Sequence, residues 1–101
     1  MLTLSTGTSP IRITKVNGKV RVRQAHVDKS YSLETFRRLV RDLKVTEEVD
    51  GMRGSFHIYR LKDWWTVGGR TTGNPIFRFK ERWRLGIVDG FAKILDSREN
   101  F

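Results

Sequence analysis

The segment from Pro75 to Leu85 alternates apolar and basic side chains, and this alternation constrains the fold more than any other feature of the chain. A period of two separates the two kinds of side chain onto opposite faces of a strand. The apolar set is Phe77, Phe79, Trp83 and Leu85, and the basic set is Arg78, Lys80, Arg82 and Arg84. The pattern therefore predicts a strand from Ile76 to Leu85, with one face on a core and a ladder of cations on the other.

A hairpin is predicted where two alternating segments, 11–16 and 19–23, flank Asn17-Gly18, because this dipeptide accepts the positive φ angles of a type I′ turn. A two-residue turn fixes the register, so that one face collects Ile11, Ile13, Val20 and Val22 and the other collects Arg12, Lys19, Arg21 and Arg23. Arg12 then lies directly opposite Arg23, and an anion between them would relieve their repulsion.

A helix is predicted from about Ser32 to Lys44. Ser32 is a suitable N-cap, and Glu34 suits the positive end of the helix dipole. Helical spacing gives a buried stripe of Leu33, Phe36, Leu39, Val40 and Leu43, and a second, basic stripe of Arg37, Arg41 and Lys44. An acidic connector, 46–51, follows the helix.

The pattern from Ser55 onward is again typical of strands, because Phe56 and Ile58 alternate with polar residues and 64–67 is rich in β-forming residues. The glycine-rich stretch from Val67 to Pro75 predicts a loop. Two alternatives stay open for 86–96: a hairpin turning at Asp89-Gly90, or a terminal helix from about Asp89, which the apolar spacing favours.

These elements indicate an α+β fold: a twisted, mainly antiparallel sheet of four to six strands, with the helix from Ser32 packed on its apolar face.

The length predicts a single domain, 1–101, with 1–9 and 97–101 frayed. No long apolar run and no signal-peptide pattern is present, so no membrane segment is expected. The absence of cysteine fits an intracellular protein.

The net charge of +9 is unevenly distributed: 1–30 carry +5 and 51–85 carry +6, whereas 31–50 and 86–101 each carry −1. The excess therefore falls on the segments predicted as strands. Six of the eight cations on the two predicted basic faces are arginines. A guanidinium can donate two hydrogen bonds to one phosphate and can stack on a base, so this preference for arginine favours nucleic-acid binding. Cations on a strand can also serve only to solvate a sheet face or to protect a strand edge from aggregation. A face with that role usually carries both basic and acidic side chains, whereas the two predicted faces carry no acidic residue among their cations.

Two tryptophans, Trp64 and Trp65, are consecutive in a predicted strand and must point to opposite faces. One of them is therefore a candidate to stack on a base or to contact a partner. Arg70, in the glycine-rich loop, is a further candidate contact. That loop does not have the order of a nucleotide-binding P-loop.

Catalysis has little support in the sequence. The two histidines, His26 and His57, have no His, Asp or Glu neighbour at metal-ligand spacing, and the clustered carboxylates of 47–50 lie in a connector. We expect no catalytic residues, no metal site and no cofactor.

The function predicted from the sequence is non-catalytic binding of DNA or RNA, with phosphate contacts from Arg12, Lys19, Arg21, Arg23, Arg78, Lys80, Arg82 and Arg84. A helix-in-groove variant through Arg37, Arg41 and Lys44 stays open. The alternatives are a small basic interaction or inhibitor module, of the phage or mobile-element kind, that binds an acidic protein surface, and a self-assembling structural protein. No membrane partner is expected.

Overall fold

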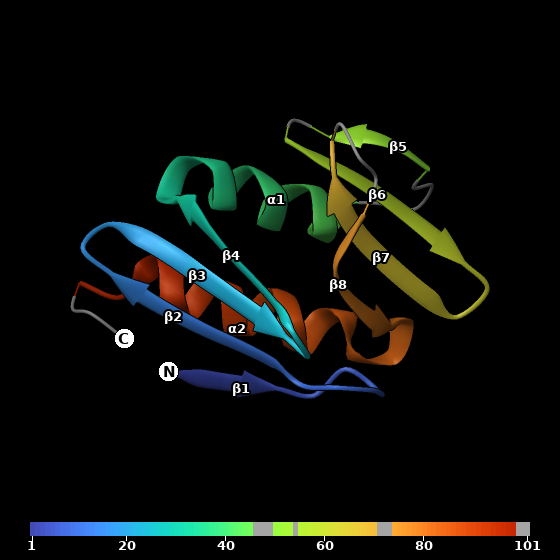
Figure 1. Ribbon diagram of the computed structural model, residues 1–101, viewed down its shortest axis with the longest axis horizontal. Helices are drawn as coiled ribbons and strands as arrows, with labels where there is room; N and C mark the ends of the chain where they lie inside the picture. The colour runs from blue at the N-terminus through green and yellow to red at the C-terminus, as the bar shows by residue number, and fades with distance from the viewer. Residues whose placement is uncertain (46–49, 54, 71–73, 99–101) are drawn as a thin grey trace.

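In the described part of the chain, eight strands form two antiparallel sheets of four strands each, and two helices accompany them (Figure 1). The computed structural model describes residues 1–45, 50–53, 55–70 and 74–98. Sheet A has the order β1 (Leu2–Leu4), β2 (Ile11–Val16), β3 (Lys19–Gln24) and β4 (Val27–Ser32). Sheet B has the order β5 (Asp50–Arg53), β6 (Phe56–Leu61), β7 (Trp64–Gly69) and β8 (Pro75–Lys80). The predicted α+β class with antiparallel pairing is confirmed, and the strands are divided between two sheets.

The predicted hairpin of β2 and β3 is confirmed in its turn and in its register. Asn17 and Gly18 have φ angles of 52° and 76°, and Val16 pairs with Lys19. Arg12 pairs with Arg23 further along the same ladder. The apolar face is fully buried, with 0% exposure at Ile11, Ile13, Val20 and Val22.

The first helix, α1, spans Leu33–Val45. Ser32 caps it as predicted, because the Thr35 N–H donates to the Ser32 hydroxyl at 3.2 Å. The predicted stripe lies in the core at Phe36, Leu39, Val40 and Leu43, and Leu33 packs against it.

The second helix, α2, spans Arg84–Asp96, so the helical alternative for 86–96 is correct and the hairpin at Asp89-Gly90 is wrong. The helix begins five residues before the position expected from the sequence, and it buries Ile87, Val88, Phe91, Ile94 and Leu95. Gly90 faces β1: a Cβ atom placed there would lie 2.5 Å from Leu4 Cδ2. Glycine at this position lets the strand and the helix approach closely.

The strand predicted from Ile76 to Leu85 is too long. β8 ends at Lys80, and a 3₁₀ turn, η1 (Glu81–Trp83), leads into α2. The Glu81 N–H donates to the Asp63 carbonyl at 2.8 Å, and the Glu81 carboxylate accepts a hydrogen bond from Trp65 Nε1. These contacts turn the chain away from the sheet. Leu85, predicted on the buried face, is consequently 65% exposed.

A single apolar core joins the inner faces of both sheets with the two helices. The Phe91 ring of α2 contacts Phe36 of α1 and Phe77 of β8, with centroid distances of 4.8 and 5.7 Å. Tyr31 of sheet A contacts Phe56 of sheet B at 5.1 Å. In Figure 1, α2 lies behind β2 and β3, so the helices cover the inner face of sheet A and leave its outer face uncovered by them.

The two sheets meet where the end of β3 approaches β8, and the buried side chain of Gln24 forms this joint. Its Nε2 donates to the carbonyls of Arg78 and Ser9, both at 2.8 Å, and its Oε1 accepts from the Arg78 N–H at 2.8 Å. The Lys80 N–H donates to the Thr6 carbonyl at 2.8 Å. The edge of β8 that does not pair with β7 is therefore satisfied by groups of sheet A and of its β1–β2 loop.

The C-terminal end of α2 is held by two cations from other elements. Lys15, a buried residue on the inner face of β2, donates from Nζ to the Ser97 carbonyl. Arg37 of α1 donates to the Leu95 carbonyl at 3.4 Å. Cations at this end complement the helix dipole and pair with carbonyls that have no partner within the helix.

The N-terminal residues are ordered in a strand, contrary to the prediction that 1–9 are frayed. Leu2–Leu4 pair with β2 and Thr6 is 1% exposed, so the first residues belong to sheet A. Residues 99–101 lie outside the described residues, as does the 46–49 part of the acidic connector. No helix in the described ranges has the length and apolar character needed to span a membrane.

Replacing Gln24 by Met keeps the volume of the side chain but removes all its hydrogen bonds to Arg78 and Ser9. We expect the free energy of unfolding to fall by about 2–4 kcal/mol, because unpaired buried polar groups each cost about 1–3 kcal/mol. Urea unfolding measures the change. Ser30→Ala, on the exposed face of β4, is the control and should change stability by less than about 0.5 kcal/mol. A Gln24→Met variant as stable as this control would contradict the role of the joint.

Tyr31 gives the stability a defined alkaline pH dependence. Burial raises the pKa of its phenol to about 12, from about 10 in the unfolded chain. The stabilising contribution is therefore complete below pH 10 and is lost as the pH rises from 10 through 12, since the phenolate is more stable in the unfolded state. Urea midpoints between pH 8 and 11.5 should fall more steeply for the wild type than for Tyr31→Phe. Parallel curves would contradict this assignment.

Candidate nucleic-acid interface

The outer face of sheet A collects the four cations that the sequence predicted for the first hairpin. Strand alternation places Arg12, Lys19, Arg21 and Arg23 opposite the buried residues of β2 and β3. Arg12, Lys19 and Arg21 are exposed and Arg23 is half-buried. The strands of sheet A also place hydroxyl groups on this face, at Thr3, Thr14, Ser30 and Ser32.

Asp28 is the one carboxylate that the four strands of sheet A place on this face, and Arg21 binds it. Arg21 Nε donates to Asp28 Oδ1 at 2.8 Å, and Nη2 donates to Oδ2. The hydrogen bond from Arg21 lowers the pKa of Asp28, and the charges of Arg21 and Arg23 lower it further against the effect of desolvation. Arg21 is thus already engaged, whereas Arg12 and Lys19 make no side-chain hydrogen bond to the described residues.

The second cluster of cations and aromatic rings lies on the outer face of sheet B. Trp64 is half-buried there, with the Arg78 guanidinium 4.6 Å and the Lys80 ammonium 5.4 Å from its ring centroid. Trp64 and Lys80 are direct cross-strand partners. Cation–π contact of this kind holds the two charges over the ring instead of leaving them free in solvent.

Trp65 points to the opposite face of β7, as the alternation of a strand requires. It is 1% exposed, stacks on Phe79 at 6.1 Å and donates to Glu81. Of the two candidate tryptophans, Trp65 is therefore a core residue, and only Trp64 lies where a ligand can approach.

The four cations predicted on one strand face of 76–85 belong to three different elements. β8 carries only the first two of them, Arg78 and Lys80. Arg82 lies in η1, exposed, with its guanidinium 5.1 Å from the centroid of the Trp83 ring. Arg84 opens α2 with a side chain only 17% exposed. Its Nε lies 2.9 Å from Glu81 Oε2 and its Nη1 donates to the Leu43 carbonyl at 2.9 Å. Arg84 therefore joins η1 to α1 and is not available to a phosphate.

The two basic sheet faces belong to different sheets, contrary to the assumption of a single sheet that would join them. Their strands nevertheless meet at the Gln24 joint, where β3 and β8 are in contact. Arg23 precedes Gln24 in β3, and Arg78 supplies the backbone that Gln24 binds. The joint therefore brings the strand ends that carry Arg23 and Arg78 side by side.

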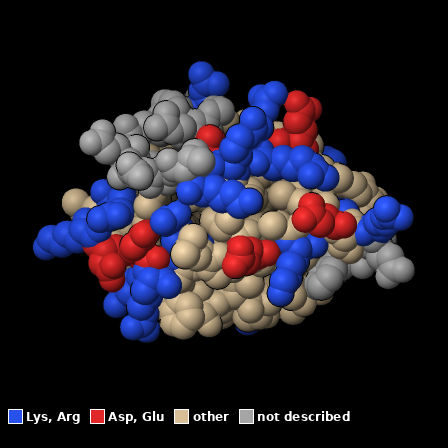
Figure 2. All heavy atoms as spheres, turned by 180° about the vertical axis from the view of Figure 1, so that it is seen from behind, with Lys and Arg blue, Asp and Glu red and all other residues tan. Residues whose placement is uncertain are grey.

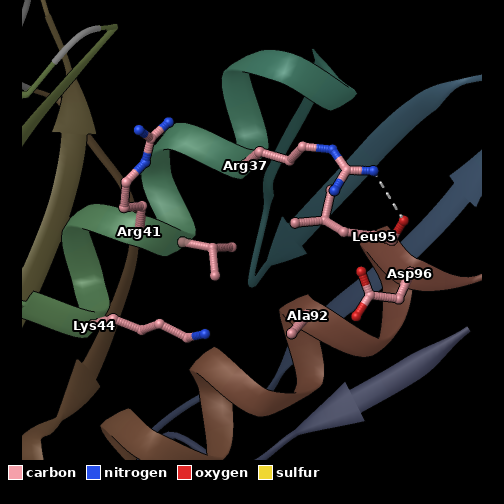
Figure 3. Close-up of a pocket in the computed structure, with 7 residues that line it drawn as sticks. Arg37, Arg41, Lys44, Ala92, Leu95 and Asp96 are labelled. Carbon is pink, nitrogen blue, oxygen red and sulfur yellow. Dashed lines mark hydrogen bonds between the residues drawn. The ribbon is translucent and has the colours of Figure 1, made fainter.

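The predicted basic stripe of α1 lines a groove between the two helices (Figure 3). Arg37, Arg41 and Lys44 form its α1 side, above a floor that includes Val40 and Leu95, and the cavity measures about 300 Å³. Asp96 stands on the α2 side. The three cations of the stripe are exposed, and Arg37 is also tied to α2 through the Leu95 carbonyl, so the stripe borders the neighbouring helix along this groove.

The molecule seen from behind, with α2 toward the viewer, carries both signs of charge. Figure 2 shows acidic side chains scattered among the basic ones over this face. On α2 itself, Asp89 and Asp96 are exposed beside Lys93. This mixture differs from the outer face of sheet A, where cations outnumber carboxylates by four to one.

One further candidate from the sequence, Arg70, gains little from the structure. Arg70 is exposed directly after β7, but 71–73 of its loop lie outside the described residues.

The described residues contain no group of three or more His, Asp or Glu side chains that could hold a metal ion. Comparison with protein-family models, with curated proteins and with solved structures gave no match.

Two residues central to this site were missed from the sequence, Asp28 and Gln24. Both depend on the β3–β4 hairpin, whose Ala25-His26 turn has no Asn-Gly or Asp-Gly signal. Ala25 adopts a φ of 54°, a conformation that alanine rarely takes. The alternation of Val27, Asp28, Lys29, Ser30 and Tyr31 was the signal that could have revealed β4.

Arg84 and Arg82 should respond differently to neutralisation. Arg84→Gln removes hydrogen bonds to Glu81 and to the Leu43 carbonyl, and we expect it to lower the free energy of unfolding by about 2 kcal/mol. Arg82→Gln, an exposed change of the same charge, should cost less than about 0.5 kcal/mol. Chemical denaturation of both variants measures the difference. Equal stabilities would show that the Arg84 contacts are not structural.

Proposed function

We propose that this protein binds nucleic acid without catalysis, through phosphate contacts made by the outer face of sheet A. The observation that carries the proposal is the separation of charge: four cations share this face with one carboxylate, while the face that bears α2 mixes both signs. A face that needed only solvation would not require this separation.

The geometry of a strand supports contact with a phosphate chain. Alternate side chains of a strand are spaced by about 7 Å, close to the spacing of phosphates along a single strand. Lys19 and Arg23, which Asp28 does not hold, are four residues apart on β3 and so lie about two phosphate spacings from each other. The hydroxyl groups on the same face can donate to phosphate oxygens as well. Contacts of this kind are made to the nucleic-acid backbone and not to the bases, so we expect weak sequence specificity. Because the proposed ligand is nucleic acid, we expect the protein to act inside the cell.

The cluster of Trp64, Arg78 and Lys80 supplies a second kind of contact. Arg78 and Lys80 lie over the Trp64 ring, and when they turn to flanking phosphates the ring face becomes open to a stacked base. With Arg82 included, six cations remain after Arg21 and Arg84 are set aside: Arg12, Lys19, Arg23, Arg78, Lys80 and Arg82. If all six bind phosphates, the logarithm of the binding constant should fall against the logarithm of salt concentration with a slope of about −4 to −5.

Binding of an acidic protein surface is a second candidate, favoured by the groove between α1 and α2. Its three cations stand above an apolar floor, a combination that suits a protein segment better than a phosphate chain. Affinity capture after nuclease treatment tests it: a protein lost specifically on Arg41→Gln/Lys44→Gln would support this role.

The test of the main proposal is fluorescence anisotropy with single-stranded DNA, duplex DNA and RNA at several salt concentrations between 50 and 300 mM. We expect Arg12→Gln/Lys19→Gln to weaken binding and to reduce the magnitude of the salt slope by about 1.4–1.8, since each phosphate contact contributes about 0.7–0.9. Both side chains are exposed, so the fold should be kept.

The matched control is Lys93→Gln/Arg98→Gln, which removes the same charge from exposed positions in α2 and after it. It should lower affinity slightly and leave the slope unchanged. Equal slopes in the two double variants would mean that net charge alone drives the binding, and would contradict the assignment to sheet A. Absence of binding at 50 mM salt would reject the proposed function.

A further inference from the structure

A hollow lies at the end of sheet A where Arg12 and Arg23 face each other across β2 and β3. Both arginines line it, together with Ser9, Pro10 and Ala25, and its volume is about 240 Å³. Two like charges directly opposite each other on a sheet are unfavourable unless an opposite charge is near.

Arg23 has hydrogen-bonding capacity that the described residues do not use. Its Nε is buried and has no hydrogen-bond partner among them, and its Nη2 donates to the Met1 sulfur at 3.3 Å, a weak acceptor. Asp28 is the cross-strand neighbour of Arg23 on β4, but both of its oxygens accept from Arg21. A buried donor without a partner costs about 1–3 kcal/mol, which an oxyanion would relieve.

The hollow suits a tetrahedral oxyanion in size and in chemistry. Its volume is well above the share of about 30 Å³ that one water molecule occupies in the liquid, so a phosphate group fits. A guanidinium presents paired N–H groups that match two oxygens of a phosphate, and two arginines can hold one phosphate from two sides.

We propose that the hollow between Arg12 and Arg23 binds one backbone phosphate of a nucleic acid and orders the strand on sheet A. This inference rests on the proposed function and names the place where one phosphate is held more tightly than the others. Arg23 supplies its guanidinium from β3, and Arg12 completes the site from β2. Arg21 takes no part, because Asp28 holds it.

The arginine Nε–Hε signals of the ¹⁵N-labelled protein report directly on this site. We expect inorganic phosphate, and separately an oligothymidylate, to shift the Arg23 signal saturably, with Arg23→Lys identifying the signal by its absence. Sodium chloride at matched ionic strength should leave it in place. Arg23→Lys keeps the charge but lacks Nε, so it should weaken oligothymidylate binding at least fivefold, whereas Arg21→Lys should weaken it less than twofold.

The outcomes separate this site from the proposed function. Saturable shifts with phosphate but not with oligothymidylate would show a site for free phosphate and overturn the backbone assignment. Nucleic-acid binding that is equal in Arg23→Lys and wild type, without a saturable Arg23 shift, would reject the hollow and leave the proposed function standing. Should Arg23→Lys not fold, as judged by its amide spectrum, Arg12→Lys provides the same comparison from the other side of the hollow.

Discussion

The buried amide of Gln24 is the interaction on which the arrangement of the two sheets depends. A strand edge that is buried must have partners for its N–H and carbonyl groups, and β8 finds them in this side chain and in the Thr6 carbonyl. Both groups come from sheet A or from its β1–β2 loop. The single core, the contact of Tyr31 with Phe56 and the closeness of Arg23 to Arg78 in the backbone all follow from this meeting of the sheets.

Burial on one side forces charge onto the other side of each sheet. The helices and the inner faces enclose the apolar residues, so alternation sends the cations of β2 and β3 to the outer face of sheet A. Two cations that are largely withdrawn from solvent have fixed partners: Lys15 donates to the Ser97 carbonyl, and Arg84 donates to Glu81. Cations without such partners, Arg12 and Lys19 among them, are those that a phosphate chain can reach.

Local signals predicted the parts of this fold that local forces decide. The Asn17-Gly18 turn set the register of the hairpin, and the Ser32 cap with its apolar stripe placed α1 within one residue. Prediction was wrong where a distant contact competes with a pattern: the alternation of 76–85 continues past Lys80, but Asp63 and Trp65 hold Glu81 in a turn. The Ala25-His26 turn escaped prediction because no residue there favours a positive φ.

The sequence by itself determined that the chain separates cations from apolar residues along alternating strands, because side-chain direction in a strand depends on position alone. It also determined that Trp64 and Trp65 point to opposite sides. Only the tertiary structure decided which cations remain available, since Arg21 is taken by Asp28 and Arg84 by the Leu43 carbonyl through contacts between elements. It likewise decided that Arg12 and Arg23 border a hollow, because cavities arise from the packing of segments that no local pattern relates.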